Sequence, residues 1–140
     1  MTDPDEMTRR RRYIYRAHLP ELHDVSLAEA PERKRVLVVS WNAVNGGLRQ
    51  PVCAVITDEE RERTLPTYVE LDPAETDGGV ERPSFILCHA LHTLTERHLD
   101  AHPLGQIAGY KMAEVEEAIA RALDFRGANS GTPTETASTG

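Results

Sequence analysis

Residues 35–41 read Arg-Val-Leu-Val-Val-Ser-Trp, a short and nearly continuous apolar run that is rich in β-branched side chains. A run of this length with polar residues on both sides is typical of a strand that is buried on both faces, because a buried helix would need about ten or more residues. The stretch therefore predicts the central strand of a β-sheet.

Further strand-like stretches lie before and after this run, and turn-forming residues separate them. They cover residues 13–17, 51–56, 67–71, 84–91 and 104–107. We expect loops at residues 18–34 and 72–83, and a turn within residues 42–50, where Asn-Gly-Gly is a strong turn signal. Short loops between consecutive strands favour antiparallel pairing, because parallel strands need long crossover connections.

The hydrophobic period becomes helical after Lys111. Apolar residues then recur on one face, at Met112, Val115, Ala118, Ile119, Ala122 and Leu123. The start of this helix lacks a good capping residue, since Ala108 and Gly109 precede it. The pattern predicts a mostly β protein of the α+β class, a small antiparallel β-barrel that one amphipathic C-terminal helix closes.

The two ends of the chain are polar, and we expect residues 1–9 and 126–140 to be disordered. Residues 10–125 would then form one domain, which is long enough to bury a core without disulfides or a structural metal. Two cysteines make no disulfide framework, and no stretch is apolar enough to span a membrane or to serve as a signal peptide. We therefore expect a cytoplasmic protein.

The charge of the chain is unevenly distributed. Its 16 Lys and Arg against 23 Asp and Glu give a formal charge of −7, which argues against a protein that coats nucleic acid. The basic residues gather at 9–16 and 33–35, whereas most acidic residues follow residue 57. A small local site for phosphate therefore remains compatible with the acidic total.

Several aromatic residues and both cysteines have two interpretations. Trp41 and the tyrosines at 13, 15 and 68 could stack on bases, but we favour the core. Cys53 and Cys88 are most simply buried strand thiols.

Two histidines that follow Cys88 are candidates for acid–base chemistry, because an imidazole titrates near neutral pH. They are His89 and His92. In a regular strand Cys88 and His92 would share a face while His89 points away. This spacing and the lack of a second paired motif argue against a metal site, so we expect no metal and no cofactor.

The order of several short stretches resembles one known family. These stretches are residues 14–19, 36–40, 54–57, 65–71, 84–88 and 104–105, followed by residues 112–118. From about Arg10 to Phe125 the chain resembles the MazF/PemK toxins of bacterial toxin–antitoxin pairs. The order and spacing of the stretches carry this resemblance, together with the closing helix.

The resemblance implies an SH3-like barrel and a homodimer. Its members are metal-independent endoribonucleases that cut single-stranded RNA at short sequence motifs, by attack of a 2′-hydroxyl on the neighbouring phosphate. An antitoxin with an acidic tail silences them by covering the RNA site. DNA binding by the toxin alone is not expected.

The resemblance also assigns site residues. Thr57 matches the family threonine, and the family's Arg-Pro falls on Lys34-Arg35, so that the catalytic cation is Lys34 or Arg35. We expect RNA contacts from other basic residues beside the first long loop, namely Arg11, Arg12, Arg16 and Arg33, and from His92.

Two alternatives stay open because the family motifs are altered here. The family's Gly-Asp before the first strand is Arg12-Tyr13, and its Asp-Gln-Ile-Arg falls on residues 89–92. The chain could be a MazF-like barrel that has lost catalysis and acts as a binding or regulatory module. It could also be a toxin that acts on a protein target such as gyrase.

Overall fold

A computed structural model describes residues 9–18, 35–58 and 65–125 of the chain. These residues form an antiparallel six-stranded sheet with the order β4-β5-β3-β2-β1-β6. The strands are β1 (Tyr13–Arg16), β2 (Arg35–Val38), β3 (Val52–Thr57), β4 (Tyr68–Leu71), β5 (Ser84–Thr93) and β6 (Gly105–Gln106). The helices are α2 (Asn42–Leu48), α3 (Gly109–Ala122) and the short 3-10 turns η2 (Pro73–Glu75) and η3 (Glu96–His98).

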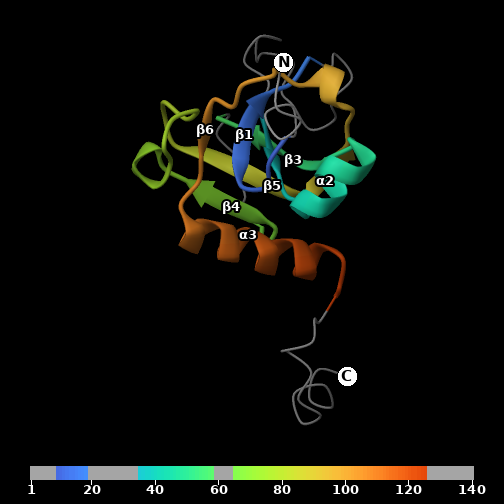
Figure 1. Ribbon diagram of the computed structural model, residues 1–140. Helices are drawn as coiled ribbons and strands as arrows, with labels where there is room; N and C mark the ends of the chain where they lie inside the picture. Colours follow the sequence, from blue (N-terminus) through green and yellow to red (C-terminus); the bar gives the residue numbers. More distant parts are fainter. Residues whose placement is uncertain (1–8, 19–34, 59–64, 126–140) are drawn as a thin grey trace.

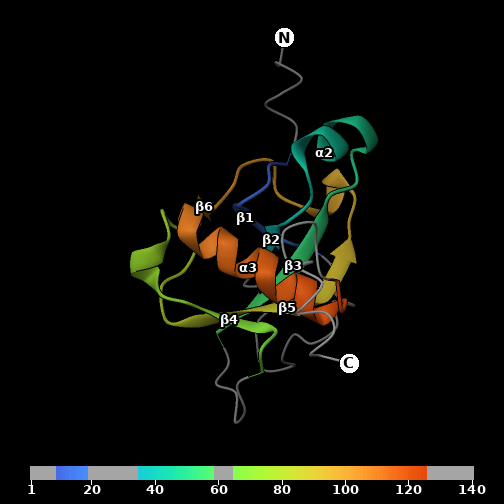
Figure 2. The same ribbon diagram turned by 90° about the horizontal axis from the view of Figure 1, so that it is seen from below.

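The sheet curls into a half-barrel, and α3 crosses one of its faces (Figure 1). The view from below shows the length of α3 lying across the strands (Figure 2). The predicted α+β fold with antiparallel strands and a closing C-terminal helix is confirmed. Our expectations for residues 1–8 and 126–140 concern segments outside the described residues.

Both faces of the sheet are buried, which explains why its central strands are apolar at almost every position. One cluster packs under α3 and includes Ile14, Leu37, Ile56, Ile86 and Val115. The other lies on the opposite face and includes Tyr15, Val36, Val55, Leu87 and Leu99. Neighbouring residues of a strand alternate between these two clusters, because successive side chains point to opposite faces.

Helix α3 uses its apolar stripe as predicted. Met112, Val115 and Ala118 are buried against the sheet. Its N-cap residue, Ala108, makes no side-chain capping bond. The expectation of a poorly capped start is confirmed, and packing of the apolar stripe holds the helix in place.

The turn expected within residues 42–50 is wrong, since Asn42–Leu48 forms α2. Asn45 anchors this helix: its side chain is 1% exposed, accepts a hydrogen bond from the Ser40 hydroxyl and donates one to the Ser40 carbonyl. The helix ends at Arg49 in the left-handed conformation. Trp41, which precedes it, is 70% exposed, so its expected place in the core is also wrong.

Strand β5 contains an irregularity that changes which residues share a face. Its pairing with β3 shifts between Ala54, which faces Leu91, and Val55, which faces Leu87. Cys88 therefore packs with the cluster under α3, whereas Ala90, two residues on, packs on the opposite face. The regular alternation that would have placed Cys88 and His92 on one face does not continue through this irregularity.

Candidate functional site

Arg16 and Arg35 are direct cross-strand partners, at the end of β1 and the start of β2. Cross-strand partners place their side chains on the same face of a sheet, with Cβ atoms about 4.5–5.5 Å apart. Like charges on directly opposite residues repel each other and destabilise a sheet. An anion bound between the two guanidinium groups would relieve this repulsion.

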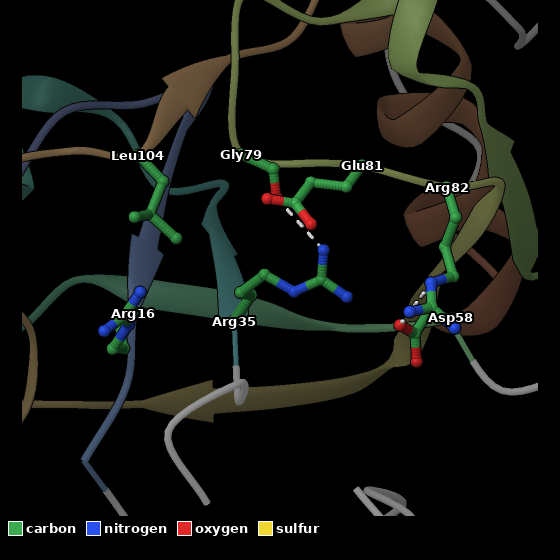
Figure 3. Close-up of a pocket in the computed structure, with 7 residues that line it drawn as sticks. All are labelled: Arg16, Arg35, Asp58, Gly79, Glu81, Arg82 and Leu104. Carbon is green, nitrogen blue, oxygen red and sulfur yellow. Dashed lines mark hydrogen bonds and ion pairs between the residues drawn. The ribbon is translucent and has the colours of Figure 1, made fainter. Parts of the chain in front are cut away.

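A cavity of about 220 Å³ opens beside this pair (Figure 3). Its lining residues come from β1, from β2, from the residue after β3 and from the loops that precede β5 and β6. They are Arg16, Arg35, Asp58, Gly79, Glu81, Arg82 and Leu104. We call this cavity the arginine pair pocket. A volume of this size accommodates a phosphodiester group and the sugar atoms next to it.

Hydrogen bonds and an ion pair hold the charged groups of the arginine pair pocket in position. The Arg35 Nη1 atom donates to the Gly79 carbonyl at 3.0 Å. The Asp58 carboxylate lies 3.4 Å from the Arg82 Nε atom, and 15% of the Asp58 side chain is exposed. Figure 3 shows Arg35 between Arg16 on one side and the Asp58–Arg82 pair on the other. Three arginines and two carboxylates thus combine anion binding with a proton acceptor.

Close packing of glycines fixes the loop that supplies Gly79. Gly78 and Gly79 have φ angles of +96° and +89°. A Cβ atom on Gly105 of β6 would lie 2.1 Å from the Gly78 carbonyl oxygen. Only a glycine permits this approach, so the loop is fastened to β6 at this point.

The Thr57 side chain points to the face of the sheet opposite to the arginine pair pocket. Arg35 pairs with Ile56, so these two side chains share a face, and Thr57 as the next residue points to the other face. Thr57 is completely buried, whereas Asp58 lines the pocket with Arg35. The structure therefore does not bring the two predicted catalytic residues Arg35 and Thr57 together. Lys34 and Arg33 lie outside the described residues.

The N-terminal arginines lie at the other end of β1. Arg9 is 4% exposed and donates to the carbonyls of Glu96 and Leu99 at 2.8 and 2.9 Å, so it is a structural residue. Arg11 donates to the Val39 carbonyl and pairs with Glu116 of α3. Arg12 donates its backbone N–H to Val38 at 2.8 Å.

None of the histidines and cysteines of β5 and β3 lines the arginine pair pocket. His92 pairs with Cys53, which in turn pairs with Val38 at the far end of β2 from Arg35. His89 is exposed and stacks on Tyr68 at 5.5 Å between ring centroids. Cys53 and Cys88 are buried thiols, as predicted, and burial raises the pKa of each to about 12.

Two polar members of the pocket, Glu81 and Arg82, were not predicted from the sequence, and Asp58 stood out there only as an acid that would repel a phosphate. Glu81 and Arg82 belong to a stretch that reads only as a polar loop, and their approach to β2 depends on the contacts of that loop with β6. Within the described ranges, no three His, Cys, Asp or Glu residues are arranged to hold a metal ion. No helix in the same ranges is long and apolar enough to cross a membrane.

Comparisons with known proteins point to one family. The family model described as "PemK-like, MazF-like toxin of type II toxin-antitoxin system" matches residues 10–123. No curated protein sequence matches the chain.

Solved structures also match. An endoribonuclease from mycobacterial species is 26% identical with a TM-score of 0.64, over 86% of this chain and 95% of that one. The Mycobacterium tuberculosis toxin MazF-mt6 is 26% identical with a TM-score of 0.62, over 81% and 98%. A mycobacterial endoribonuclease in complex with its cognate antitoxin is 25% identical with a TM-score of 0.60, over 81% and 93%.

Proposed function

The chain belongs to the PemK-like, MazF-like family of toxins of type II toxin–antitoxin systems, and from this premise we propose that it is an endoribonuclease that cuts single-stranded RNA. The observation that carries the proposal is the cross-strand pair Arg16–Arg35 beside a cavity of phosphate size. Two matched structures from mycobacterial species are described as endoribonucleases, at 25–26% identity.

In the proposed reaction the 2′-oxygen of a nucleotide attacks the adjacent phosphorus, and the bond from phosphorus to the 5′-oxygen breaks. The products are a 2′,3′-cyclic phosphate and a free 5′-hydroxyl. Negative charge develops on the phosphorane oxygens, and the guanidinium groups of Arg16 and Arg35 stabilise it with charge-assisted hydrogen bonds. The cations supply what a metal ion would otherwise provide, so we propose that the reaction is metal-independent.

The same pocket offers a proton acceptor. The Asp58 carboxylate, held by Arg82, lies in the pocket lining together with the Glu81 carboxylate. We assign to one of these carboxylates the removal of the proton from the 2′-hydroxyl, since general bases must lie within hydrogen-bond reach of the proton that they take. The proton then returns to the leaving 5′-oxygen.

The family resemblance points to an alternative active site at Thr57, which matches the family threonine. Thr57 lies on the other face of the sheet, so it would need a cation different from Arg35. Lys34 occupies the family arginine's column and is the candidate for that role. Single variants of Arg35, Lys34 and Thr57 therefore decide which face of the sheet cuts RNA.

Partners follow from the family and from the described surface. One matched structure holds a cognate antitoxin, and we propose that an antitoxin with an acidic tail silences this toxin as well. We propose a cytoplasmic homodimer. Trp41 and Leu48, at the start and end of α2, are 70% and 67% exposed and give such a dimer an apolar surface to bury.

The test is an RNA cleavage assay in EDTA with the purified chain and a long single-stranded RNA. Wild type should yield discrete fragments with 2′,3′-cyclic phosphate ends, and Arg35→Ala and Arg16→Ala should reduce the rate at least about a hundredfold. Arg121→Ala is the matched control, because Arg121 is an exposed arginine on α3 that pairs only with its neighbour Glu117 among the described residues.

Each outcome has a distinct meaning. Loss of cutting in Thr57→Ala and Lys34→Ala but not in Arg35→Ala would move the site to the opposite face of the sheet. Equal background with wild type and all variants would reject the nuclease. The catalytically lapsed module would then be tested by RNA binding without cleavage, and the protein-targeting toxin by inhibition of gyrase.

A further inference from the structure

A second basic cavity lies at the opposite end of β1 from the arginine pair pocket. Its volume is about 340 Å³. Its lining residues are Arg10, Arg11, Arg12, Tyr13, Asn42 and Gln106, and none of them is acidic. We call it the N-terminal arginine pocket. Three consecutive arginines with two amides and a phenol make a set of donors suited to phosphate oxygens.

Contacts with the sheet and α2 fix the backbone that carries these arginines. The Arg11 N–H donates to the Asn42 Oδ1 atom at 2.8 Å, and the Arg12 N–H donates to the Val38 carbonyl at 2.8 Å. The Arg10 N–H donates to the Tyr15 hydroxyl at 3.0 Å. These bonds tie the arginine run to β1, to the end of β2 and to α2, so they hold the backbone of the pocket in place.

The three arginine side chains differ in how far other protein groups already engage them. Arg11 is committed to Glu116 and to the Val39 carbonyl. The Gln106 amide, oriented to satisfy both neighbours, accepts from the Arg12 Nε atom at 3.1 Å and donates to the Tyr13 hydroxyl at 3.0 Å. Arg12 is therefore oriented by a neutral group, and no ion pair engages its side chain within the described ranges. The Arg10 side chain is exposed.

The backbone conformation of Arg12 indicates that its side chain has a functional role. Its φ angle is +81°, a region that favours glycine and is costly for a residue with a Cβ atom. Glycine would adopt this conformation without strain. An arginine kept at such a position destabilises the fold slightly, and this is the pattern expected where a side chain serves binding.

The two basic cavities lie at opposite ends of one short strand. From Arg12 to Arg16 the chain advances four residues, which corresponds to about 13 Å in an extended strand. A single strand of RNA of a few nucleotides spans this distance. A strand that enters the arginine pair pocket therefore has a second set of cations within reach of its own backbone.

We propose that the N-terminal arginine pocket is a second phosphate-binding subsite, which holds the RNA backbone one or more nucleotides away from the bond that is cut. This inference rests on the proposed function, because it takes RNA as the substrate. Contacts to phosphate fix the position of a strand without reading its sequence. The subsite therefore adds affinity and length dependence, and leaves the choice of cleavage motif to other residues.

The experiment measures binding of a single-stranded RNA whose 2′-oxygens are methylated, so that it cannot be cut. Fluorescence anisotropy gives Kd at several salt concentrations for wild type, Arg12→Gly, Arg10→Ala and the remote control Arg121→Ala. Arg12→Gly should weaken binding about three- to tenfold and lower the slope of log K against log salt by about 0.7, as loss of one phosphate contact requires.

The stability of the same variants separates a binding role from a structural one. Arg12→Gly removes the strain at the positive φ angle, so its melting temperature should equal or exceed that of wild type while its affinity falls. A lower melting temperature together with an unchanged salt slope would assign Arg12 to the fold and overturn the proposal. Arg10→Ala, with its exposed side chain, should show the same loss of slope.

Cleavage of substrates of two lengths completes the test. A dinucleotide fits only the arginine pair pocket, so wild type and Arg12→Gly should cut it at equal rates. A long RNA should be cut more slowly by the variant at low substrate concentration. Equal rates on both substrates would overturn the second subsite and leave the nuclease standing, whereas absence of any cutting by wild type would reject the proposed function itself.

Discussion

Arg16 and Arg35 are opposite each other on adjacent antiparallel strands. Arg35 donates a hydrogen bond to the Gly79 carbonyl, whereas Arg16 does not. The Arg16 Nε atom is buried and has no hydrogen-bond partner within the described part of the chain. The pair therefore carries two unfavourable features, like charges on directly opposite residues and an unsatisfied donor. Both would be relieved when an anion binds between the guanidinium groups.

Substitution of Arg16 by glutamine should separate stability from activity. Arg16→Gln removes the repulsion with Arg35 and should raise the free energy of unfolding by about 0.5–1 kcal/mol. The same change should reduce RNA cleavage strongly, because one of the two phosphate-binding cations is lost. Urea unfolding and the cleavage assay measure the two effects. A variant that is both less stable and fully active would contradict this account of the pair.

The contact between Gly105 and Gly78 should be intolerant of any side chain. A Cβ atom at Gly105 would lie 2.1 Å from the Gly78 carbonyl oxygen, and both groups are backbone that cannot move alone. Gly105→Ala should therefore destabilise the protein by about 2–3 kcal/mol. Gly47→Ala is the matched control, since no atom lies within 4 Å of its added Cβ and the residue is helical. Thermal unfolding of the two variants should differ in sign.

A partly buried ion pair that joins η2 to α3 should make the stability of the fold depend on pH. A hydrogen bond from the Asp72 N–H lowers the pKa of Glu75, and the Tyr110 hydroxyl and Lys111 add to this effect. Lys111 is 7% exposed and lies 3.3 Å from the Glu75 carboxylate. Because the folded-state pKa is depressed, the stabilisation is present above the unfolded pKa of about 4.3 and is lost as pH falls through the folded value.

Glu75→Gln should therefore be less stable than wild type by about 1–2 kcal/mol at pH 7, with the difference shrinking below about pH 4. Urea unfolding across this range measures it. Tyr110→Phe removes one donor to the Glu75 carboxylate and should show a smaller effect with the same pH dependence. A difference that stays constant from pH 7 to pH 3 would exclude the assigned role of the carboxylate.

Local periodicity was enough to predict the sheet and the closing helix, because both depend on apolar residues that recur at a fixed spacing. The run at residues 35–41 and the stripe from Met112 carried this information. Helix α2 was not predicted because its two glycines indicate a turn. The hydrogen bonds from the Asn45 side chain to Ser40, which hold the helix, leave no pattern in the sequence. Strand register was equally hidden.

The candidate site was predictable only in part for the same reason. Arg16 and Arg35 were identified from charge and from the family resemblance, but their direct pairing follows from the register of β1 against β2. The opposite orientation of Thr57 follows from the register of β2 against β3. Asp58 and Arg82 meet through a loop that glycine contacts fold back onto β6. None of these long-range relationships has a signature in the sequence.

We predict that Arg9 is a structural residue whose guanidinium group another cation cannot replace. Its guanidinium donates to the carbonyls of Glu96 and Leu99 and lies 5.9 Å from the centroid of the Tyr15 ring. Arg9→Ala would leave two carbonyls without their donor, and should lower the free energy of unfolding by about 2–4 kcal/mol. Arg9→Lys should recover less than half of this loss, because both bonds come from Nη2 and a lysine ammonium is one bond shorter than this atom.

Arg10→Ala is the matched control for this prediction, because Arg10 is the next residue and its side chain is exposed. It should change the stability by less than about 0.5 kcal/mol. Urea unfolding of the three variants measures the effects. If Arg9→Ala unfolds like wild type, then Arg9 does not hold η3 against β1, and the N-terminal boundary of the folded domain lies after it.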